Sequence, residues 1–147
     1  MEVTLSPALE EDREFCRQAH HEAYRDVVER QFGAWDEAMQ DRFFSRTWWD
    51  VKLEIVHVDG VRAGCFSREE HDDALFLRSV FLLSDFQRRG VGTQLIQATL
   101  TEATTRNLPI IVRLLNLSRA RPLLLRLGFK DTTSDVIHRY MEWASPK

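Results

Sequence analysis

The sequence predicts a mixed α/β fold with the element order βααβββαβαββ. Three observations predict it. Apolar residues recur near helical spacing within residues 9–32, as in an amphipathic helix. The pair Asp59-Gly60 separates two apolar runs, which is typical of a two-residue β-hairpin. Residues 110–115 form a continuous apolar run, as in a strand buried on both faces. Together they favour one sheet with helices on both faces.

The first third of the chain is expected to contain a strand at residues 2–5 followed by two helices. A long charged helix covers residues 9–32, and Gly33 would end it because glycine adopts the left-handed backbone of a C-terminal cap. The second helix is expected to start after Asp36, its N-cap. Its inner face would carry the apolar residues Met39, Phe43 and Phe44.

The remainder is expected to hold six strands and two helices. The strands are expected at residues 52–58, 61–67, 75–83, 110–115, 129–133 and 136–143. The helices are expected at residues 93–106 and 118–127. Neither an internal repeat nor a linker divides the sequence, and 147 residues suffice for one core, so a single domain is expected over residues 1–147.

Composition points to a cytoplasmic protein that binds neither a metal nor a membrane. The sequence is 44% hydrophobic and 29% charged, as in soluble globular proteins. It has no apolar run of membrane-helix length, and its acidic start lacks the features of a signal peptide. The two cysteines, Cys16 and Cys65, suggest neither a disulfide framework nor a metal site.

Charge is distributed unevenly along the chain. Residues 1–77 carry 18 acidic and 9 basic residues, a balance of −9, whereas residues 78–147 carry 5 and 11, a balance of +6. Solvated helix faces are one explanation. The other is a polyanionic ligand on the basic half and an amine-bearing substrate beside the acidic half. Nucleic acid fits poorly, because the pI is about 6 and no basic stripe alternates with aromatic residues.

The segment Gln87-Arg88-Arg89-Gly90-Val91-Gly92 lies between a predicted strand and a predicted helix. Such a turn directs backbone N–H groups toward one point at the positive end of the helix dipole, an arrangement that binds phosphate. Glycines let the anion approach the backbone, and the two arginines add positive charge. The spacing matches neither G-x-G-x-x-G nor a P-loop. A pyrophosphate-bearing ligand is therefore expected.

The turn resembles the Q/R-x-x-G-x-G/A signature of the GNAT family of N-acetyltransferases, which bind the pyrophosphate of acetyl-coenzyme A. Leu127-Gly128-Phe129 and Ala120-Arg121 extend the resemblance, which covers about residues 51–143. It implies a GNAT-like fold, a mostly antiparallel sheet with a splayed parallel pair of strands. It also implies acetyl-coenzyme A as co-substrate and acetyl transfer to a primary amine of a small molecule or peptide.

The resemblance also implies which residues contact the cofactor. They are Val80, Leu82, Gln87, Arg88, Arg89, Gly90, Val91, Gly92, Thr93, Ser118 and Arg121. The two strand residues would act through their backbone groups. Ser118 stands where the family usually has an asparagine, and Asn116, two positions earlier, is the alternative.

The catalytic acid and base stay unassigned, because the sequence departs from the family at both. Leu124 stands where the family commonly has a proton-donating tyrosine, and the strand before the turn lacks the glutamate of several relatives. The candidates are His138 and Tyr140, on the last predicted strand. Other groups able to accept a proton are Asp36, Glu37, Glu69, Glu70 and His71.

The acceptor pocket of the family is built by the loop after the first helix and by the final strands. In this sequence that loop is aromatic, with Tyr24, Phe32 and Trp35 as expected substrate contacts. Aromatic rings can surround an ammonium group, although core packing under a loop explains them equally. A non-catalytic acyl-coenzyme A binder and a nucleotide-binding module remain alternatives, and the chain could be a monomer or a homodimer.

Overall fold

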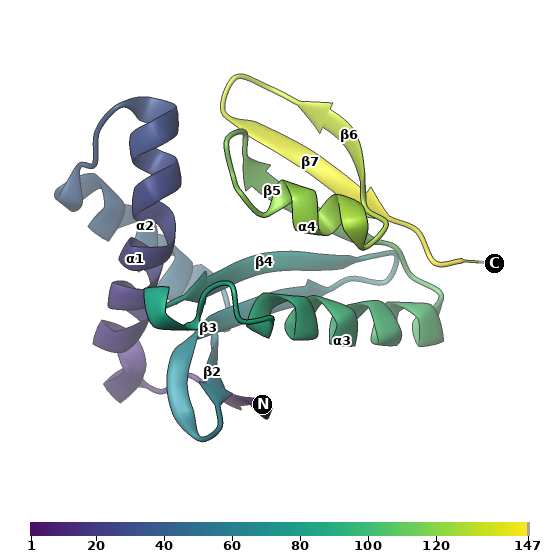
Figure 1. Ribbon diagram of the computed structural model, residues 1–147, viewed down its shortest axis with the longest axis horizontal. Coiled ribbons are helices and arrows are strands. Elements are labelled where there is room, and N and C mark those ends of the chain that lie inside the picture. The colour runs from purple at the N-terminus through teal and green to yellow at the C-terminus, as the bar shows by residue number, and fades with distance from the viewer. Residues whose placement is uncertain (147) are drawn as a thin grey trace. The chain divides into compact units, whose positions relative to one another are not determined.

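The computed structural model describes residues 1–146, in which seven strands and four α-helices follow the order predicted from the sequence (Figure 1). The strands are β1 (Val3–Pro7), β2 (Glu54–Val58), β3 (Val61–Glu70), β4 (Leu75–Leu82), β5 (Ile110–Leu115), β6 (Lys130–Ser134) and β7 (His138–Trp143). The helices are α1 (Arg13–Phe32), α2 (Glu37–Asp50), α3 (Val91–Arg106) and α4 (Arg121–Arg126), with the short 3-10 helices η1 (Glu10–Asp12) and η2 (Ser84–Phe86). No helix within residues 1–146 is long and apolar enough to cross a membrane.

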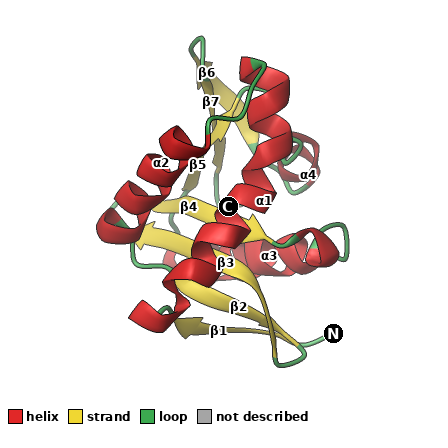
Figure 2. Cartoon of the chain, turned by 90° about the vertical axis from the view of Figure 1, so that its left-hand side faces the viewer, coloured by secondary structure: helices red, strands yellow, loops and turns green. Residues whose placement is uncertain are grey.

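The strand order of the sheet is β1-β2-β3-β4-β5-β7-β6, and Figure 2 shows β1 to β4 side by side. The pairs β1–β2, β2–β3, β5–β7 and β6–β7 are antiparallel. Only three residue pairs form the parallel β4–β5 ladder, which joins residues 75–77 to residues 110–112, although both strands continue beyond it. The mixed sheet with a splayed parallel pair is confirmed.

The chain folds into two compact units, and β3, β4 and α3 each run from one unit into the other. The first unit comprises residues 1–67 and 79–92. Its core holds the buried side chains of Cys16, Ala19, Phe44, Leu53, Ile55, Cys65 and Phe81. Gly64 lies so close to β4 that an added Cβ would be 1.9 Å from the carbonyl oxygen of Phe81.

The second unit comprises residues 68–78 and the chain from residue 93 onward. The largest side chains that it buries are those of Leu75, Ile110, Leu124, Phe129 and Met141. Strand β6 is exposed along its whole length, and its pairing with β7 is irregular between Asp131 and Thr133.

Three local expectations are confirmed in the backbone. Gly33 ends α1 in the left-handed conformation, with φ of 88°. The Asp36 side chain accepts a hydrogen bond from the Met39 N–H at 3.0 Å and so caps α2. Asp59 and Gly60 both have positive φ, 49° and 82°, as a tight hairpin turn requires.

Two expectations about the helices are wrong. Met39 and Phe43 are exposed, at 40% and 44%, and only Phe44 is buried, because α2 turns Gln40 and Phe44, four residues apart, inward. Helix α4 starts at Arg121 rather than residue 118. A helix that included Ser118 would force the ring of Pro122 against the Ser118 carbonyl, so a turn precedes the helix instead.

Candidate functional site

The glycine turn lies in the first unit, between η2 and the start of α3. Arg88 and Gly90 have positive φ, 61° and 84°, so left-handed residues alternate with others along the turn. The Gln87 side chain ties the turn to β4 by donating a hydrogen bond to the Leu82 carbonyl at 2.8 Å. The Arg89 guanidinium donates to the Asp85 carbonyl at 3.3 Å. Alternating backbone of this kind turns successive N–H groups toward a common point.

The N–H groups of this turn are not used by the protein itself. Those of residues 88–90 donate to no acceptor in the part of the chain that the structure describes. The next N–H groups, at residues 91–93, belong to the first turn of α3. The N–H groups of a first helical turn have no acceptor within their own helix. A row of donors therefore stands at the positive end of a 16-residue helix, and an anion is the group that satisfies it.

The two glycines play different roles. Gly90 needs to be glycine because its φ of +84° is costly for any other residue. Gly92 is helical, and an added Cβ there would meet nothing within 4 Å. Packing within the protein therefore gives no reason for glycine at position 92. The space that a Cβ would occupy at Gly92 is open, which fits a pyrophosphate lying against the backbone.

The strand residues expected at the cofactor precede this turn. Val80 is half-buried and Leu82 is 9% exposed. One acceptor position of the Leu82 carbonyl is already taken by the Gln87 side chain. Thr93, in the second unit, lies in the first turn of α3.

The remaining expected cofactor residues lie in the second unit and have partners there. The Ser118 hydroxyl accepts from the Ala120 N–H at 3.2 Å, which closes the turn before α4. The Asn116 amide donates to the Asp135 carbonyl at 2.8 Å, so it holds the β6–β7 hairpin. The Arg121 guanidinium pairs with the Asp131 carboxylate and lowers its pKa. The charge of Arg121 is therefore already balanced by the protein.

His138 and Tyr140 are half-buried and stand two residues apart on β7, so they share one face of the sheet. Burial, and then the charge of Arg113, lowers the pKa of His138, which keeps its ring neutral at pH 7. Leu124, where the family has a tyrosine, is 2% exposed and belongs to the core of the second unit.

The other carboxylates and the imidazole considered as bases have structural partners. Glu69 pairs with His71 and Arg78, at 3.2 and 3.4 Å. Glu70 pairs with Arg68 and Arg106, both at 3.3 Å. These residues form a surface network on β3 and its neighbours.

The aromatic residues expected around the acceptor have different neighbours. The Tyr24 ring packs against His20 and Phe81, with centroids 5.0 and 5.4 Å away. The Trp35 indole donates to Glu37 at 2.6 Å, and the Arg25 guanidinium lies 5.7 Å from its ring. Phe32 is 52% exposed at the end of α1.

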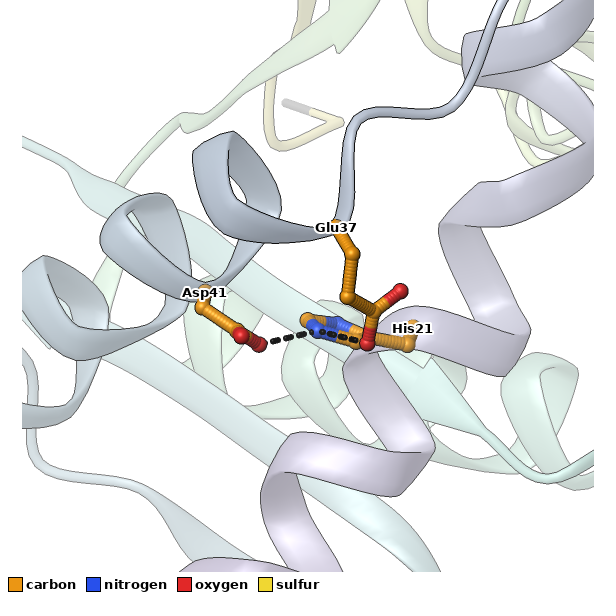
Figure 3. Close-up of side chains that lie close together, drawn as sticks. All are labelled: His21, Glu37 and Asp41. Carbon is orange, nitrogen blue, oxygen red and sulfur yellow. Dashed lines mark hydrogen bonds and ion pairs between the residues drawn. The ribbon is translucent and has the colours of Figure 1, made fainter.

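The structure assembles a polar cluster between α1 and α2 that sequence reasoning missed. Figure 3 shows the His21 ring between the carboxylates of Glu37 and Asp41. The His21 Nε2 lies 2.7 Å from Asp41 Oδ1 and 3.6 Å from Glu37 Oε1. Arg17 contacts the same carboxylates, its Nε at 2.8 Å from Asp41 and its Nη2 at 2.9 Å from Glu37. The sequence did carry a signal for this cluster. Positions 17 and 21 on α1, like positions 37 and 41 on α2, are four residues apart and therefore lie on one face of their helix.

The three ligand-type atoms of His21, Glu37 and Asp41 lie within 4.8 Å of one another, close enough for a cation to bridge. The Arg17 guanidinium already supplies that cation, because it donates to both carboxylates. The cluster is therefore an ion-paired network rather than a vacant set of metal ligands. A hollow of about 340 Å³ opens beside it and is lined by Glu10, Glu11, Arg13, Glu14, Arg17, Asp41, Phe44 and Ser45.

Comparison with known proteins agrees with this geometry. The family model described as the acetyltransferase (GNAT) family matches residues 9–129. The fold is similar to that of the PaiA N-acetyltransferase of Thermoplasma acidophilum in complex with coenzyme A, with a TM-score of 0.75, 14% identity, and coverage of 98% of this chain and 99% of that one. It is also similar to the ribosomal-protein-S18-alanine N-acetyltransferase of Escherichia coli, with a TM-score of 0.67, 18% identity, and coverage of 99% and 96%. No curated protein sequence matches this chain significantly.

Proposed function

The chain belongs to the acetyltransferase (GNAT) family, and on that premise we propose that it transfers an acetyl group from acetyl-coenzyme A to a primary amine of a small molecule or peptide. It is an N-acetyltransferase with acetyl-coenzyme A as co-substrate. We further propose that residues 1–147 act as one acetyltransferase domain. The family model spans residues 9–129, which supports this.

The observation that carries the proposal is the donor row of residues 88–93. It combines unused N–H groups, positive φ at Arg88 and Gly90, and the open space over Gly92. A pyrophosphate supplies many acceptor oxygens and two negative charges, so it matches a donor-only surface with arginines at its rim. Ordinary helix N-termini do not need a glycine that neither conformation nor packing explains.

The strand before the turn would hold the acyl arm. Backbone N–H and C=O groups of Val80 and Leu82 are the proposed partners, with the Leu82 carbonyl shared with Gln87. Ser118 and Asn116 both remain candidates at the other end of the arm. The Arg121 guanidinium is already paired with Asp131, so it would add little positive charge to the site. The backbone donors are therefore expected to supply most of the affinity for coenzyme A.

Acetyl transfer requires a neutral amine that attacks the thioester directly within a ternary complex. The acceptor is expected to be cationic in solution, because residues 1–77 carry a balance of −9. Salt screens such steering over about 8–10 Å. The KM of the acceptor should therefore rise with salt. A KM that falls with salt, or a preference for acidic amines, would contradict the expected cationic acceptor.

Cys16 and Cys65 are free buried thiols, which fits a reducing cytoplasm.

Calorimetry with coenzyme A tests the site. Gly90→Asp places a carboxylate among the donors and should abolish binding. Gly60→Asp is the matched control, because Gly60 also has positive φ, +82°, and open space around it, but lies in the β2–β3 hairpin. Both variants carry the same backbone strain. Equal affinity of the two variants for coenzyme A would refute the site.

Activity is tested by thiol release from acetyl-coenzyme A with a panel of primary amines and peptides. Mass spectrometry should find one acetyl group on the best acceptor. Binding of coenzyme A without acetyl transfer to any amine would contradict the proposed reaction.

A further inference from the structure

A continuous hydrogen-bonded chain leads from a buried imidazole to the surface of the first unit. The Asp41 Oδ1 lies 2.7 Å from His21 Nε2, and His21 Nδ1 lies 2.9 Å from His20 Nδ1. The side chain of Asp41 is 41% exposed, that of His21 is 13% exposed, and the residue His20 is 5% exposed. Solvent exposure thus falls from one member of this hydrogen-bonded series to the next, from Asp41 on α2 to His20 on α1.

The partners determine where the protons sit on the two rings. Hydrogen bonds from Arg17 and then His21 lower the pKa of Asp41, so this carboxylate is ionised and only accepts. His21 therefore donates from Nε2, and we infer that its Nδ1 accepts. His20 must then donate from Nδ1, which leaves the lone pair of its Nε2 free of a proton.

The ring of His20 lies among aromatic rings. The ring centroids of Tyr24, Phe44 and Phe81 lie 5.0, 5.6 and 5.0 Å from that of His20. No group within residues 1–146 forms a hydrogen bond with Nε2. Burial, and then the neighbouring His21, lowers the pKa of His20 to about 4, so the ring is neutral at pH 7. An apolar side chain would fill this space without the cost of burying a polar nitrogen.

Phe81 connects this imidazole with the acyl-transfer strand. It lies between Val80 and Leu82, the two residues proposed to hold the acyl arm, and all of these residues belong to the first unit. The His20 ring meets the Phe81 ring edge-on, with an interplanar angle of 84°. The imidazole ring of His20 is thus packed against the strand along which the reaction would take place.

We propose that His20 is the general base of the acetyl transfer, and that His21 and Asp41 conduct the proton to the surface. The proposal rests on the proposed function. The ammonium form of the acceptor gives its proton to His20 Nε2 and keeps its electron pair as the neutral amine. His20 Nδ1 passes its own proton to His21 Nδ1, and His21 Nε2 passes its proton to the Asp41 carboxylate.

The outward transfer ends in water and leaves the amine free to attack. Asp41 lines the hollow beside α1 and α2 and can release the proton there. Each ring ends with its proton on the opposite nitrogen. After the product leaves, His20 Nε2 gives its proton to water in the emptied acceptor site, and a proton taken up by Asp41 returns through His21 to His20 Nδ1, which restores the starting state. The titratable groups facing His20 are His21 and Tyr24 on α1 and Asp41 on α2, with Arg17 behind it; Phe44 of α2 and Phe81 of β4 do not titrate.

The test measures kcat/KM between pH 6.5 and 9.5 with 1,4-diaminobutane, phenethylamine and a short peptide with a free N-terminus as acceptors. At pH 7, His20→Gln should lower kcat/KM by about 100-fold, and Asp41→Asn should lower it by about tenfold or more. The loss should shrink as pH approaches the pKa of the acceptor, about 10 for the two alkylamines and about 8 for the peptide N-terminus, because the neutral amine then needs no base. Affinity for coenzyme A should be unchanged.

Glu14→Gln is the matched control, because Glu14 is also exposed and pairs with Arg17, at 3.2 Å, but does not contact His21. It should change the rate less than twofold. Nitrogen-15 NMR of the imidazoles should show His20 protonated at Nδ1 in the wild type.

A loss that is constant across pH, equal effects of Asp41→Asn and Glu14→Gln, or a proton on His20 Nε2 would overturn the relay while leaving the proposed function intact. A wild-type protein that acetylates none of the three probes and does not bind coenzyme A would overturn both.

Discussion

Gly92→Ala separates ligand binding from folding more cleanly than any other single change in the glycine turn. The added methyl group meets no protein atom within 4 Å, and the backbone is already helical. Stability should therefore rise by about 0.5 kcal/mol, because alanine loses less entropy than glycine in a helix. The methyl group projects into the space where the phosphate would meet the N–H groups. Loss of one charge-assisted hydrogen bond, about 1.5–3 kcal/mol, corresponds to about 10- to 150-fold in Kd.

Two measurements on the same sample check this prediction. The melting temperature should rise by about 1–2 °C, and calorimetry should show the weaker binding of coenzyme A. Thr101→Ala is the control, since Thr101 is exposed on α3, far along the helix from the turn, and the change also favours helix. It should leave the affinity unchanged. If Gly92→Ala bound coenzyme A as tightly as Thr101→Ala does, the pyrophosphate would not lie on this backbone.

Two predictions concern stability. Gly64→Ala should destabilise the protein by about 3 kcal/mol or more, since its Cβ would lie 1.9 Å from the Phe81 carbonyl oxygen; a denaturation midpoint within error of the wild type would refute the close approach. Stability should also fall as pH drops from 6.5 toward 4, because the unfolded chain protonates His20 in this window while the folded chain, with a pKa of about 4, does not. The loss should reach about 3 kcal/mol, and a His20→Gln variant should lack that part of the slope in chemical denaturation at each pH.

Much of the fold could be predicted because the signals are local. Asp59-Gly60 needs only its own backbone to form a tight turn, and Gly33 and Asp36 act within one helical turn of their positions. The glycine turn is also local, since its donors come from consecutive residues between a strand and a helix. These features depend little on distant parts of the chain.

The relay could not be predicted because it depends on contacts between helices. His20 and His21 are adjacent in sequence, but their partner Asp41 lies 20 residues later, and only the packing of α1 on α2 joins them. The inner face of α2 was mistaken for a similar reason. Phe43 and Phe44 are adjacent, so only one can face the core, and tertiary packing chose Phe44.

Strand β6 also determines how the molecule can meet its own copies. An edge strand presents free backbone groups to any other extended chain, which makes it a starting point for aggregation. Here the edge is short, carries Lys130 and Asp131, and is broken by the irregular pairing between Asp131 and Thr133. A flat template for strand addition is therefore absent along β6. This side of the sheet should remain closed to fibril-like growth even at the high protein concentrations of a crystallisation or NMR sample.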